Sequence, residues 1–548
     1  MVMRVSTEDD ALPRIVPAGT RMPGAADAGA AIALGAVATL AAALAFVPIG
    51  AGNDQALFVY YAQRLLAGAL PYLELWDNKN PGIFGFYAGA VGVFGPGWEG
   101  VRLACAVWLG LGAAMLALLG RTAAPGTRAA WIAVALAIGL TLLRADYKRI
   151  GQVEALAPVP LAALLWLCAI EPARDGARRL RWIAAGVAVG VVAALKLVLA
   201  PVAAAVMAVA LAWRLGRREF GLGDAAAAIG LSLVGFVAVW APILAYVAAS
   251  GGFAEFRWTT LDYPRRALLE VEGQKPQRLL ASLKWLAVTT AAMWPAAALC
   301  LLRLRGRWRG VDGLVAAACI AWLVVGLAMI ATQRFSWWDT HMDLLIWPVA
   351  LLAALGIVSR PVAVRIPGAV VGSDRLRVAV GVFAALGIAL HAGRLARDAA
   401  TDPDWPRPRT ELAALGTARE VAARADAPCG TVYAIGDQAG VERATGLAQA
   451  LPTHGLWFGA FLPAQAARLP GELAAARPDL VYLDRDERAD FARRQPEVGA
   501  AIDGWLSEGY REVASDALGG VWWQRRTAPG DAAACPRAAR FTIPSAGR

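Results

Sequence analysis

The sequence predicts a polytopic α-helical membrane protein with a small α/β domain near its C-terminal end. Of its 548 residues, 58% are hydrophobic and 17% are charged, and the mean hydropathy is +0.51. A soluble domain is roughly half apolar and a quarter charged. Long apolar segments alternate with short arginine-rich loops, which is the pattern of membrane helices. These segments are too long to be the strands of a membrane barrel, so helices remain.

We expect about eleven membrane-spanning helices, although several of the apolar segments are shorter than the ~20 residues of a full crossing. Residues 1–28 are polar with mixed charge and lack a convincing cleavable signal, so they are predicted to be an N-terminal tail. The spans are predicted at residues 29–49, 98–120, 130–143, 155–170, 182–197, 200–214, 225–248, 283–302, 312–331, 341–358 and 376–393.

The arginine-rich loops set the predicted orientation. Arginines concentrate in alternate loops such as 121–128, 171–181 and 303–310, which places these loops and the N-terminus in the cytoplasm. This predicts a multi-pass protein of the cell inner membrane, with a first outer loop at 50–97. Segment 81–94 should be an interfacial helix, because a crossing there would turn every later arginine-rich loop outward. Topology explains the net charge of +11, so we expect a lipid bilayer and no nucleic acid as partner.

The C-terminal part has the composition of an ordinary folded domain. Strand-like segments at 430–436, 479–484 and 519–526 alternate with amphipathic helical segments, which predicts a small α/β domain. An odd number of spans places this domain outside the cytoplasm. The predicted parts are a tail at 1–28, a membrane domain at 29–394, the α/β domain at 395–530 and a tail at 531–548.

The cysteines divide between these parts. Those in apolar segments are expected to be inert packing residues. Cys429 and Cys535 lie in the polar C-terminal part, where they can form a disulfide if that part is outside the cytoplasm.

Ionisable and aromatic residues gather at the outer ends of the predicted spans. Under the predicted orientation, several separate loops bring carboxylates, cations and rings to one membrane face. Ionisable residues at membrane depth are costly, so as a set they indicate a site for an anionic, lipid-borne substrate. The candidates are Asp54, Lys79, Glu154, Lys196, Asp262, Tyr263, Arg265, Arg266 and His341.

Each candidate taken alone also has a structural explanation, and these alternatives stay open. Asp54 can cap the helix that follows it, and Glu154 can favour a helix N-terminal dipole. Lys196 can extend to the membrane interface, and the arginines at 265–266 can touch lipid phosphates. His341 can be an interfacial histidine with its hydrogen bonds satisfied.

The set fits the transfer of a sugar from a polyprenyl phosphate. A carboxylate near the acceptor hydroxyl removes its proton as general base, and cations neutralise the departing phosphate. The sequence contains no Walker A motif, no convincing dinucleotide fingerprint and no H-E-x-x-H motif. With three histidines in the chain, a multi-histidine metal site is not expected. No cofactor is therefore certain, and a divalent metal is not supported by the sequence.

The first outer loop resembles that of the GT-C integral membrane glycosyltransferases, near the protein O-mannosyltransferases and the aminoarabinose transferases of lipid A. The resemblance rests on Asp54, on "LLAGALPY" ending at Tyr72, on "WDNKNPG" with Lys79, and on "FGPGWEGVR". Three later segments resemble family motifs in the same order, and the whole likeness covers about residues 28–395: "GQVEALAPVPL" with Glu154, "AALKLVLAPV" with Lys196 and "THMDLLIWP" with His341.

The resemblance implies an activity and roles for these residues. The family transfers a sugar, with inversion, from a polyprenyl-phosphate donor on the outer face of the membrane. Here the acceptor would be an envelope glycan, lipid or protein. Asp54 would be the general base, with Lys79, Lys196, Arg265 and Arg266 as candidates for the donor phosphate. The residues expected to orient the acceptor or the sugar are Glu154, His341, Tyr263, Asp262 and Tyr72.

Two positions depart from the family pattern, and two other functions remain open. Gln55 stands where many relatives have Glu, and Asn80 stands where they have Pro, which leaves any metal requirement open. A transporter or flippase for lipid-linked precursors would place its charges near the bilayer midplane, between repeated halves. A non-catalytic scaffold would bind the donor without transferring the sugar.

Overall fold

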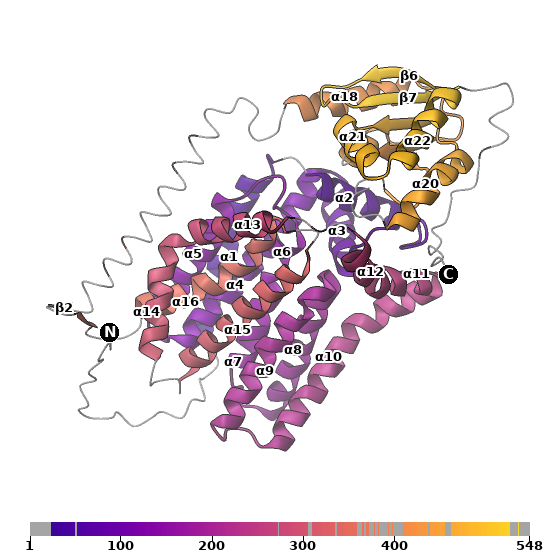
Figure 1. Ribbon diagram of the computed structural model, residues 1–548. Helices are drawn as coiled ribbons and strands as arrows, with labels where there is room; N and C mark the ends of the chain where they lie inside the picture. Colours follow the sequence, from indigo (N-terminus) through magenta and orange to yellow (C-terminus); the bar gives the residue numbers. More distant parts are fainter. Residues whose placement is uncertain are drawn as a thin grey trace.

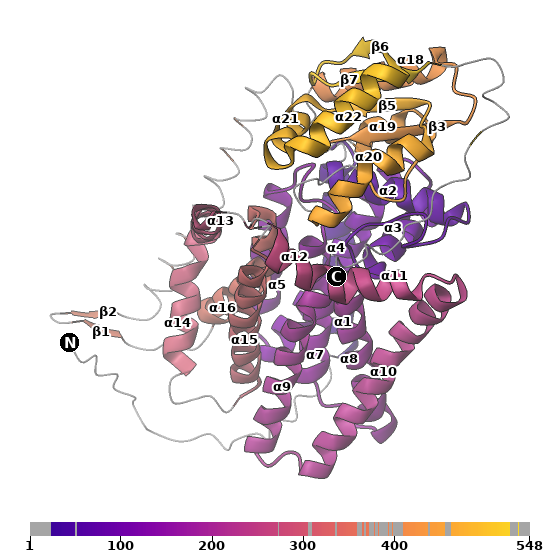
Figure 2. The same cartoon turned by 45° about the vertical axis from the view of Figure 1, so that its right-hand side comes forward.

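The computed structural model is a bundle of helices that carries an α/β domain at one end (Figure 1). Figure 2 shows the same domain resting on the first outer loop, with the long helices of the bundle extending away from it. The structure describes residues 24–49, 52–271, 273, 275–304, 310–334, 337–358, 364–366, 369–371, 378, 382, 393, 397, 409–436, 439–454, 462–526 and 535.

Among the described residues, six helical segments are long and apolar enough to cross a membrane. A seventh qualifies if α13 (Pro276–Thr289) and α14 (Trp294–Leu304) form one span, bent by 54° around the short turn η3 (Ala291–Met293). The six are α1 (Ala25–Phe46), α4 (Trp98–Ala123), η1 (Leu197–Leu199) with α9 (Ala200–Gly216), α10 (Leu222–Ala249), α15 (Val311–Thr332), and η4 (Asp339–Leu345) with α16 (Ile346–Val358).

The other predicted spans do not meet this standard, so the predicted number of about eleven is not confirmed. The 15 residues of α5 (Ala129–Leu143) are too few for a straight crossing, as are those of α6 (Val153–Leu156) with α7 (Pro158–Ala169). The first turns of α8 (Asp175–Leu195) carry several arginines, so its apolar part begins only at Trp182. The predicted span at 376–393 lies almost wholly outside the described residues.

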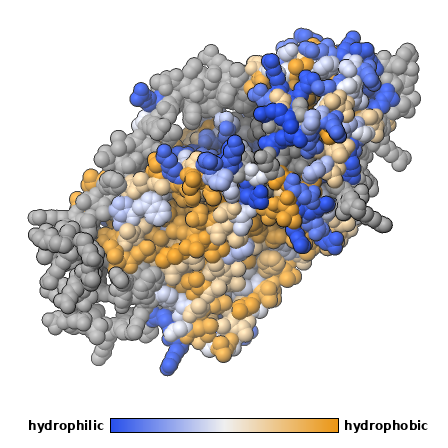
Figure 3. All heavy atoms as spheres, in the orientation of Figure 1, coloured by the Kyte–Doolittle hydropathy of each residue, from blue (hydrophilic) through white to orange (hydrophobic). Residues whose placement is uncertain are grey.

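Exposed apolar side chains cover the helical bundle on the face seen in Figure 3, while polar side chains gather on the α/β domain. Leu233, Val234 and Val237 of α10 are more than half exposed, as expected for side chains that face lipid. The bundle is therefore a multi-pass membrane domain, as predicted.

The first outer loop contains two helices, α2 (Asn53–Leu66) and α3 (Pro81–Phe94). α3 packs closely against the end of α8, because Gly82 has no side chain. A Cβ atom at Gly82 would lie 2.4 Å from the carbonyl carbon of Ala194. This contact fixes the turn just before α3. The interfacial position of α3 in the membrane stays a prediction.

A second segment lies against this loop. It is nearly continuous and consists of α11 (Phe253–Arg257), the π-helical turn η2 (Trp258–Asp262) and α12 (Tyr263–Glu270). The rings of Trp258 and Tyr263 pack on Trp76, with centroids 6.0 and 5.4 Å away. The indole N–H of Trp76 also donates to Thr259 Oγ1 at 2.9 Å, so Trp76 joins the two segments.

The C-terminal domain is α/β, as predicted. Its five-stranded sheet has the order β4-β3-β5-β7-β6, with β3 parallel to β4 and β5, and with β7 antiparallel to β5 and β6. Cys429 and Cys535 form a disulfide. The elements are α18 (Arg409–Arg424), β3 (Thr431–Ile435), α19 (Ala439–Ala444), β4 (Ala448–Gln449), α20 (Pro463–Ala476), β5 (Leu480–Leu483), α21 (Arg485–Arg494), α22 (Pro496–Gly509), β6 (Tyr510–Ser515) and β7 (Val521–Arg525); a separate antiparallel pair, β1 (Val364–Ile366) and β2 (Ala369–Val371), precedes them.

The α/β domain is docked on the first outer loop through buried contacts. The backbone N–H of Trp76 donates to the carbonyl of Pro452 at 2.9 Å, and the Tyr60 hydroxyl accepts from the backbone N–H of Gln449 at 2.8 Å. Beside them, His454 and Glu442 form a buried pair at 2.6 Å. The domain therefore helps to fix the strand-like stretch that leads from Trp76 to Lys79.

Candidate functional site

A cavity of about 660 Å³ opens at the end of the bundle where the first loop meets η2 and α12. Its walls come from the start of α2, the turn before α3, the loop between α5 and α6, the break between α8 and α9, η2 with α12, the start of α13, and residues 332–333 and 338–341. Its lining includes these ionisable side chains: Asp54, Lys79, Lys148, Glu154, Lys196, Arg278, Asp339 and His341.

Asp54 lies in the first turn of α2 and is half-buried. It does not cap the helix, because the N-cap is Gly52 and no side chain makes a cap hydrogen bond there. Its Oδ2 instead accepts a hydrogen bond of 2.9 Å from the side-chain amide of Gln152. Among the described residues, no cation lies in ion-pair range of Asp54. This carboxylate thus faces the cavity with a neutral partner.

Lys79 reaches the cavity from the turn before α3. Its backbone N–H donates to Asp77 Oδ1 at 2.9 Å, and its ammonium lies 3.8 Å from the same oxygen. The Tyr72 hydroxyl donates to the Lys79 carbonyl at 3.2 Å. Burial raises the pKa of Asp77, against the opposing effect of the Lys79 charge. Tyr72 does not line the cavity, and it acts on Lys79 through the backbone.

Glu154 and Lys196 form a tight ion pair on the cavity wall. The Lys196 ammonium donates to Glu154 Oε1 at 2.6 Å, and His341 Nε2 lies 3.6 Å from the same oxygen. Lys196 is the extended residue that separates α8 from η1, so its side chain leaves the chain at a helix break. Asn80 Oδ1 accepts from the backbone N–H of Leu197 at 2.9 Å, which ties this break to the Lys79 turn.

The predicted site residues therefore fall into two groups. Asp54, Lys79, Glu154, Lys196, Tyr263 and His341 line one cavity. Asp262 pairs with Arg257 on an exposed surface at 3.8 Å, and Arg266 pairs with Glu270 one turn along α12 at 2.8 Å. Arg265 is exposed. The residues that do not line the cavity are Tyr72, Asp262, Arg265 and Arg266.

Sequence reasoning missed several residues of the cavity wall. Gln152 and Arg278 were not among the candidates, although Gln152 lies two positions before Glu154. The Arg278 guanidinium lies 3.4 Å from the centre of the Trp338 ring, a stacked arrangement that sequence spacing does not reveal. Asn80 accepts the hydrogen bond from Leu197 that joins two walls of the cavity.

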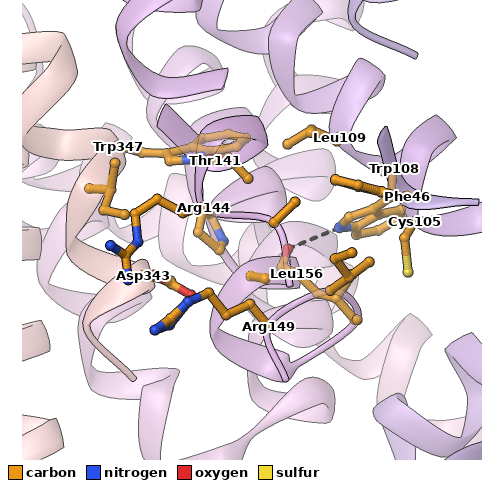
Figure 4. A pocket seen from close by; sticks show the side chains of 16 residues that line it. Phe46, Cys105, Trp108, Leu109, Thr141, Arg144, Arg149, Leu156, Asp343 and Trp347 are labelled. Carbon is orange, nitrogen blue, oxygen red and sulfur yellow. Dashed lines mark hydrogen bonds and ion pairs between the residues drawn. The ribbon is translucent and has the colours of Figure 1, made fainter. Parts of the chain in front are cut away.

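A smaller cavity of about 40 Å³ lies behind the loop between α5 and α6. In Figure 4 its labelled lining separates into apolar side chains such as Leu109 and Trp108 and a charged group of Arg144, Arg149 and Asp343. Arg149 pairs with Asp146 at 3.1 Å, with Asp343 at 3.6 Å and with Asp339. Because Asp339 also lines the larger cavity, this ion cluster supports the wall of the candidate site.

Gln55 lines the cavity beside Asp54, but its side chain is used in the contact between α2 and the loop before α6. Its side chain is 1% exposed, and its amide donates to the carbonyl of Lys148 at 2.9 Å. Within the described ranges, no group of three or more His, Cys, Asp or Glu side chains could hold a metal ion. In this chain, Gln55 joins α2 to the loop before α6.

No protein-family model matches the sequence, and no curated protein sequence matches it. Solved structures do match the fold. ArnT from Cupriavidus metallidurans bound to undecaprenyl phosphate aligns with a TM-score of 0.61 at 14% identity, over 90% of this chain and 98% of that chain. The apo state of the same protein aligns with a TM-score of 0.59 at 14% identity, over 91% of this chain and 98% of that one. The likeness is one of fold and runs nearly end to end.

Proposed function

We propose that this chain, which has the fold of the GT-C glycosyltransferases, transfers a sugar from a polyprenyl phosphate to an acceptor of the cell envelope. The resemblance noted in the first outer loop is confirmed at the level of the fold. The main observation in support of this activity is how the charged side chains in the cavity are paired. Lys196 neutralises Glu154, whereas Asp54 has only a neutral amide as partner among the described residues.

Asp54 is proposed as the general base. A carboxylate without a cationic partner keeps the basicity needed to take a proton from an acceptor hydroxyl. The acceptor oxygen forms a bond to the anomeric carbon, the bond from that carbon to the phosphate oxygen breaks, and the proton passes to Asp54. This single displacement inverts the anomeric centre and releases the polyprenyl phosphate.

Lys79 and Lys196 are proposed to bind the donor phosphate. The leaving group gains negative charge as the bond breaks, and a preorganised ammonium group stabilises that charge. Each lysine has a nearby carboxylate, which fixes its position in the cavity. Glu154, His341 and Tyr263 would orient the sugar or the acceptor. The roles suggested for four further residues stay predictions. None of these side chains lines the cavity, so none would touch a bound substrate there: Tyr72, Asp262, Arg265 and Arg266.

The lipid donor and the outer location rest on two further observations. The first matched structure is described as bound to undecaprenyl phosphate, which supports a polyprenyl-phosphate donor for this fold. The disulfide between Cys429 and Cys535 supports an oxidising compartment for the α/β domain, because disulfides persist outside the cytoplasm. The N-terminus would then lie in the cytoplasm, and the domain would cover the cavity from the outer side of the inner membrane.

The proposal can be tested with membranes that contain the full chain and a panel of radiolabelled polyprenyl-phosphate sugars. The expected result is transfer by the wild type and loss of transfer in Asp54→Asn. Glu99→Gln is a matched control, because Glu99 also lies in the first turn of a helix but does not line the cavity. Full transfer by a folded Asp54→Asn protein would remove Asp54 as the base. Binding of donor without transfer by the wild type would favour a scaffold. Mass spectrometry of envelope glycans with and without the gene identifies the acceptor.

A further inference from the structure

We propose that Gln152 is a positioning residue that holds the Asp54 carboxylate in its reactive orientation. The inference rests on the proposed function, because it assigns Asp54 the role of base. It starts from the hydrogen bond of 2.9 Å between Gln152 Nε2 and Asp54 Oδ2. The other oxygen, Oδ1, has no hydrogen-bond donor among the residues that the structure describes. One carboxylate oxygen is thus held, and the second is left for the acceptor hydroxyl.

The backbone of Gln152 is held firmly. Gln152 is the N-cap of α6, and its carbonyl accepts from the backbone N–H groups of Ala155 and Leu156 at 3.0 and 3.1 Å. The preceding residue, Gly151, has a φ of +86°, and a Cβ atom there would lie 2.4 Å from the Tyr87 hydroxyl. That hydroxyl donates to the Gly151 carbonyl at 3.1 Å. The backbone at residue 152 therefore has little conformational freedom, and the side-chain amide of Gln152 is preorganised.

The same loop is tied to α2 at two further points. The backbone N–H of Gly52 donates to the Tyr147 carbonyl at 3.0 Å, and the Gln55 amide donates to the Lys148 carbonyl at 2.9 Å. The contact between Gln152 and Asp54 is the third hydrogen bond along this seam. Because the start of α2 and the loop before α6 are held together, the backbone fixes the distance between the Gln152 amide and the Asp54 carboxylate.

A neutral donor suits a general base better than a cation does. An amide N–H stabilises the ionised carboxylate and selects one rotamer, but it carries no charge that would strongly reduce the attraction of the carboxylate for a proton. Glu154, on the same cavity wall, is instead paired with the Lys196 ammonium. The titratable and charged groups that face Asp54 or share its cavity are Asp77, Lys79, Tyr87, Tyr147, Lys148, Glu154, Lys196, Tyr263, Arg278, Asp339 and His341.

The kinetic test compares Gln152→Leu and Gln152→Glu in the full chain. Loss of the held orientation should lower kcat by about 10- to 100-fold with little change in KM for the donor. Because the lost hydrogen bond favoured the ionised carboxylate, the acidic limb of the pH–rate profile should move up by about one pH unit in Gln152→Leu. It should move further in Gln152→Glu, where a second carboxylate repels the first. Gln63→Leu is the control, since the Gln63 amide also donates a hydrogen bond, to the carbonyl of Pro96, but lies away from the cavity.

A second measurement does not need transfer activity. A water-soluble carbodiimide modifies protonated carboxyl groups, so the rate of labelling at Asp54, followed by mass spectrometry against pH, reports its titration in the full chain. The midpoint should rise by about one pH unit in Gln152→Leu and stay unchanged in Gln63→Leu. An unchanged midpoint in a folded Gln152→Leu protein overturns the inference, and so does a change confined to KM. If the midpoint moves but Asp54→Asn retains full transfer, the hydrogen bond is real and the proposed base is wrong.

Discussion

Replacing Gln55 by Glu should destabilise this protein. The Gln55 side chain is 1% exposed, and its amide donates to the Lys148 carbonyl at 2.9 Å. An ionised carboxylate cannot donate to a carbonyl, so Gln55→Glu either loses the hydrogen bond or keeps the introduced carboxyl protonated. The protonated form can donate through its O–H group and reproduce the contact.

The size of the destabilisation follows from the free energy needed to keep the introduced Glu side chain protonated. The ordinary pKa of a Glu side chain is about 4.3, so holding the group neutral at pH 7 costs about 2.7 × 1.36, or about 3.7 kcal/mol. The same cost at pH 5 is about 1 kcal/mol. The helix dipole at the N-terminus of α2 would stabilise the ionised form by roughly 0.3–1 kcal/mol, which is less than the cost of burying the charge. A folded-state pKa above the unfolded value means that stability falls as the pH rises.

The assay is the free energy of unfolding in detergent micelles, measured by denaturant titration from pH 5 to pH 8. Gln55→Glu should lose about 3–4 kcal/mol at pH 7 and about 1 kcal/mol at pH 5 relative to wild type. Gln63→Glu, at a more exposed position on the same helix, should stay within about 0.5 kcal/mol of wild type. A loss that is equal at every pH, or no loss at pH 7, would refute the reasoning.

Three further predictions concern the fold around the site. Gly82→Ala places a Cβ atom 2.4 Å from the backbone of Ala194, so it should destabilise the protein by about 1–3 kcal/mol, measured as a lower Tm. Burial raises the pKa of Asp77 in the folded protein above its value in the unfolded chain. Stability should therefore fall as the pH rises from the unfolded pKa to the folded pKa. Asp77→Asn should remove this pH dependence in unfolding titrations. Cys429→Ser removes the disulfide to Cys535, which links residues 106 positions apart in the sequence. The loss should destabilise the α/β domain by about 2–4 kcal/mol. An unchanged Tm of the wild type under reducing conditions would contradict this.

Much of the architecture follows from patterns that the sequence displays directly. Hydropathy located the long helices such as α4 and α15, and alternating strand and helix signals located the sheet of the C-terminal domain. The number of spans was not confirmed. Short apolar helices such as α5 read like spans in one dimension, because hydropathy does not tell whether a neighbouring helix or lipid covers them.

The site was predictable where a charged residue stands in an apolar context, as with Lys196 at the end of α8. It was not predictable where the role depends on a partner far along the chain. Gln152 meets Asp54 across 98 positions, and Asn80 meets Leu197 across 117. Amides are common in loops, so their composition alone carries no signal, and only the folded geometry distinguishes a positioning amide from a solvated one.

The most direct test of the central claim uses the purified chain in liposomes with a labelled polyprenyl-phosphate sugar and an envelope extract as acceptor. Donor binding and sugar transfer are measured in parallel for wild type and Asp54→Asn. The account predicts that both proteins bind the donor with similar affinity and that only the wild type transfers the sugar, with inversion at the anomeric carbon. Transfer by Asp54→Asn at the wild-type rate, or a product with retained configuration, would contradict it.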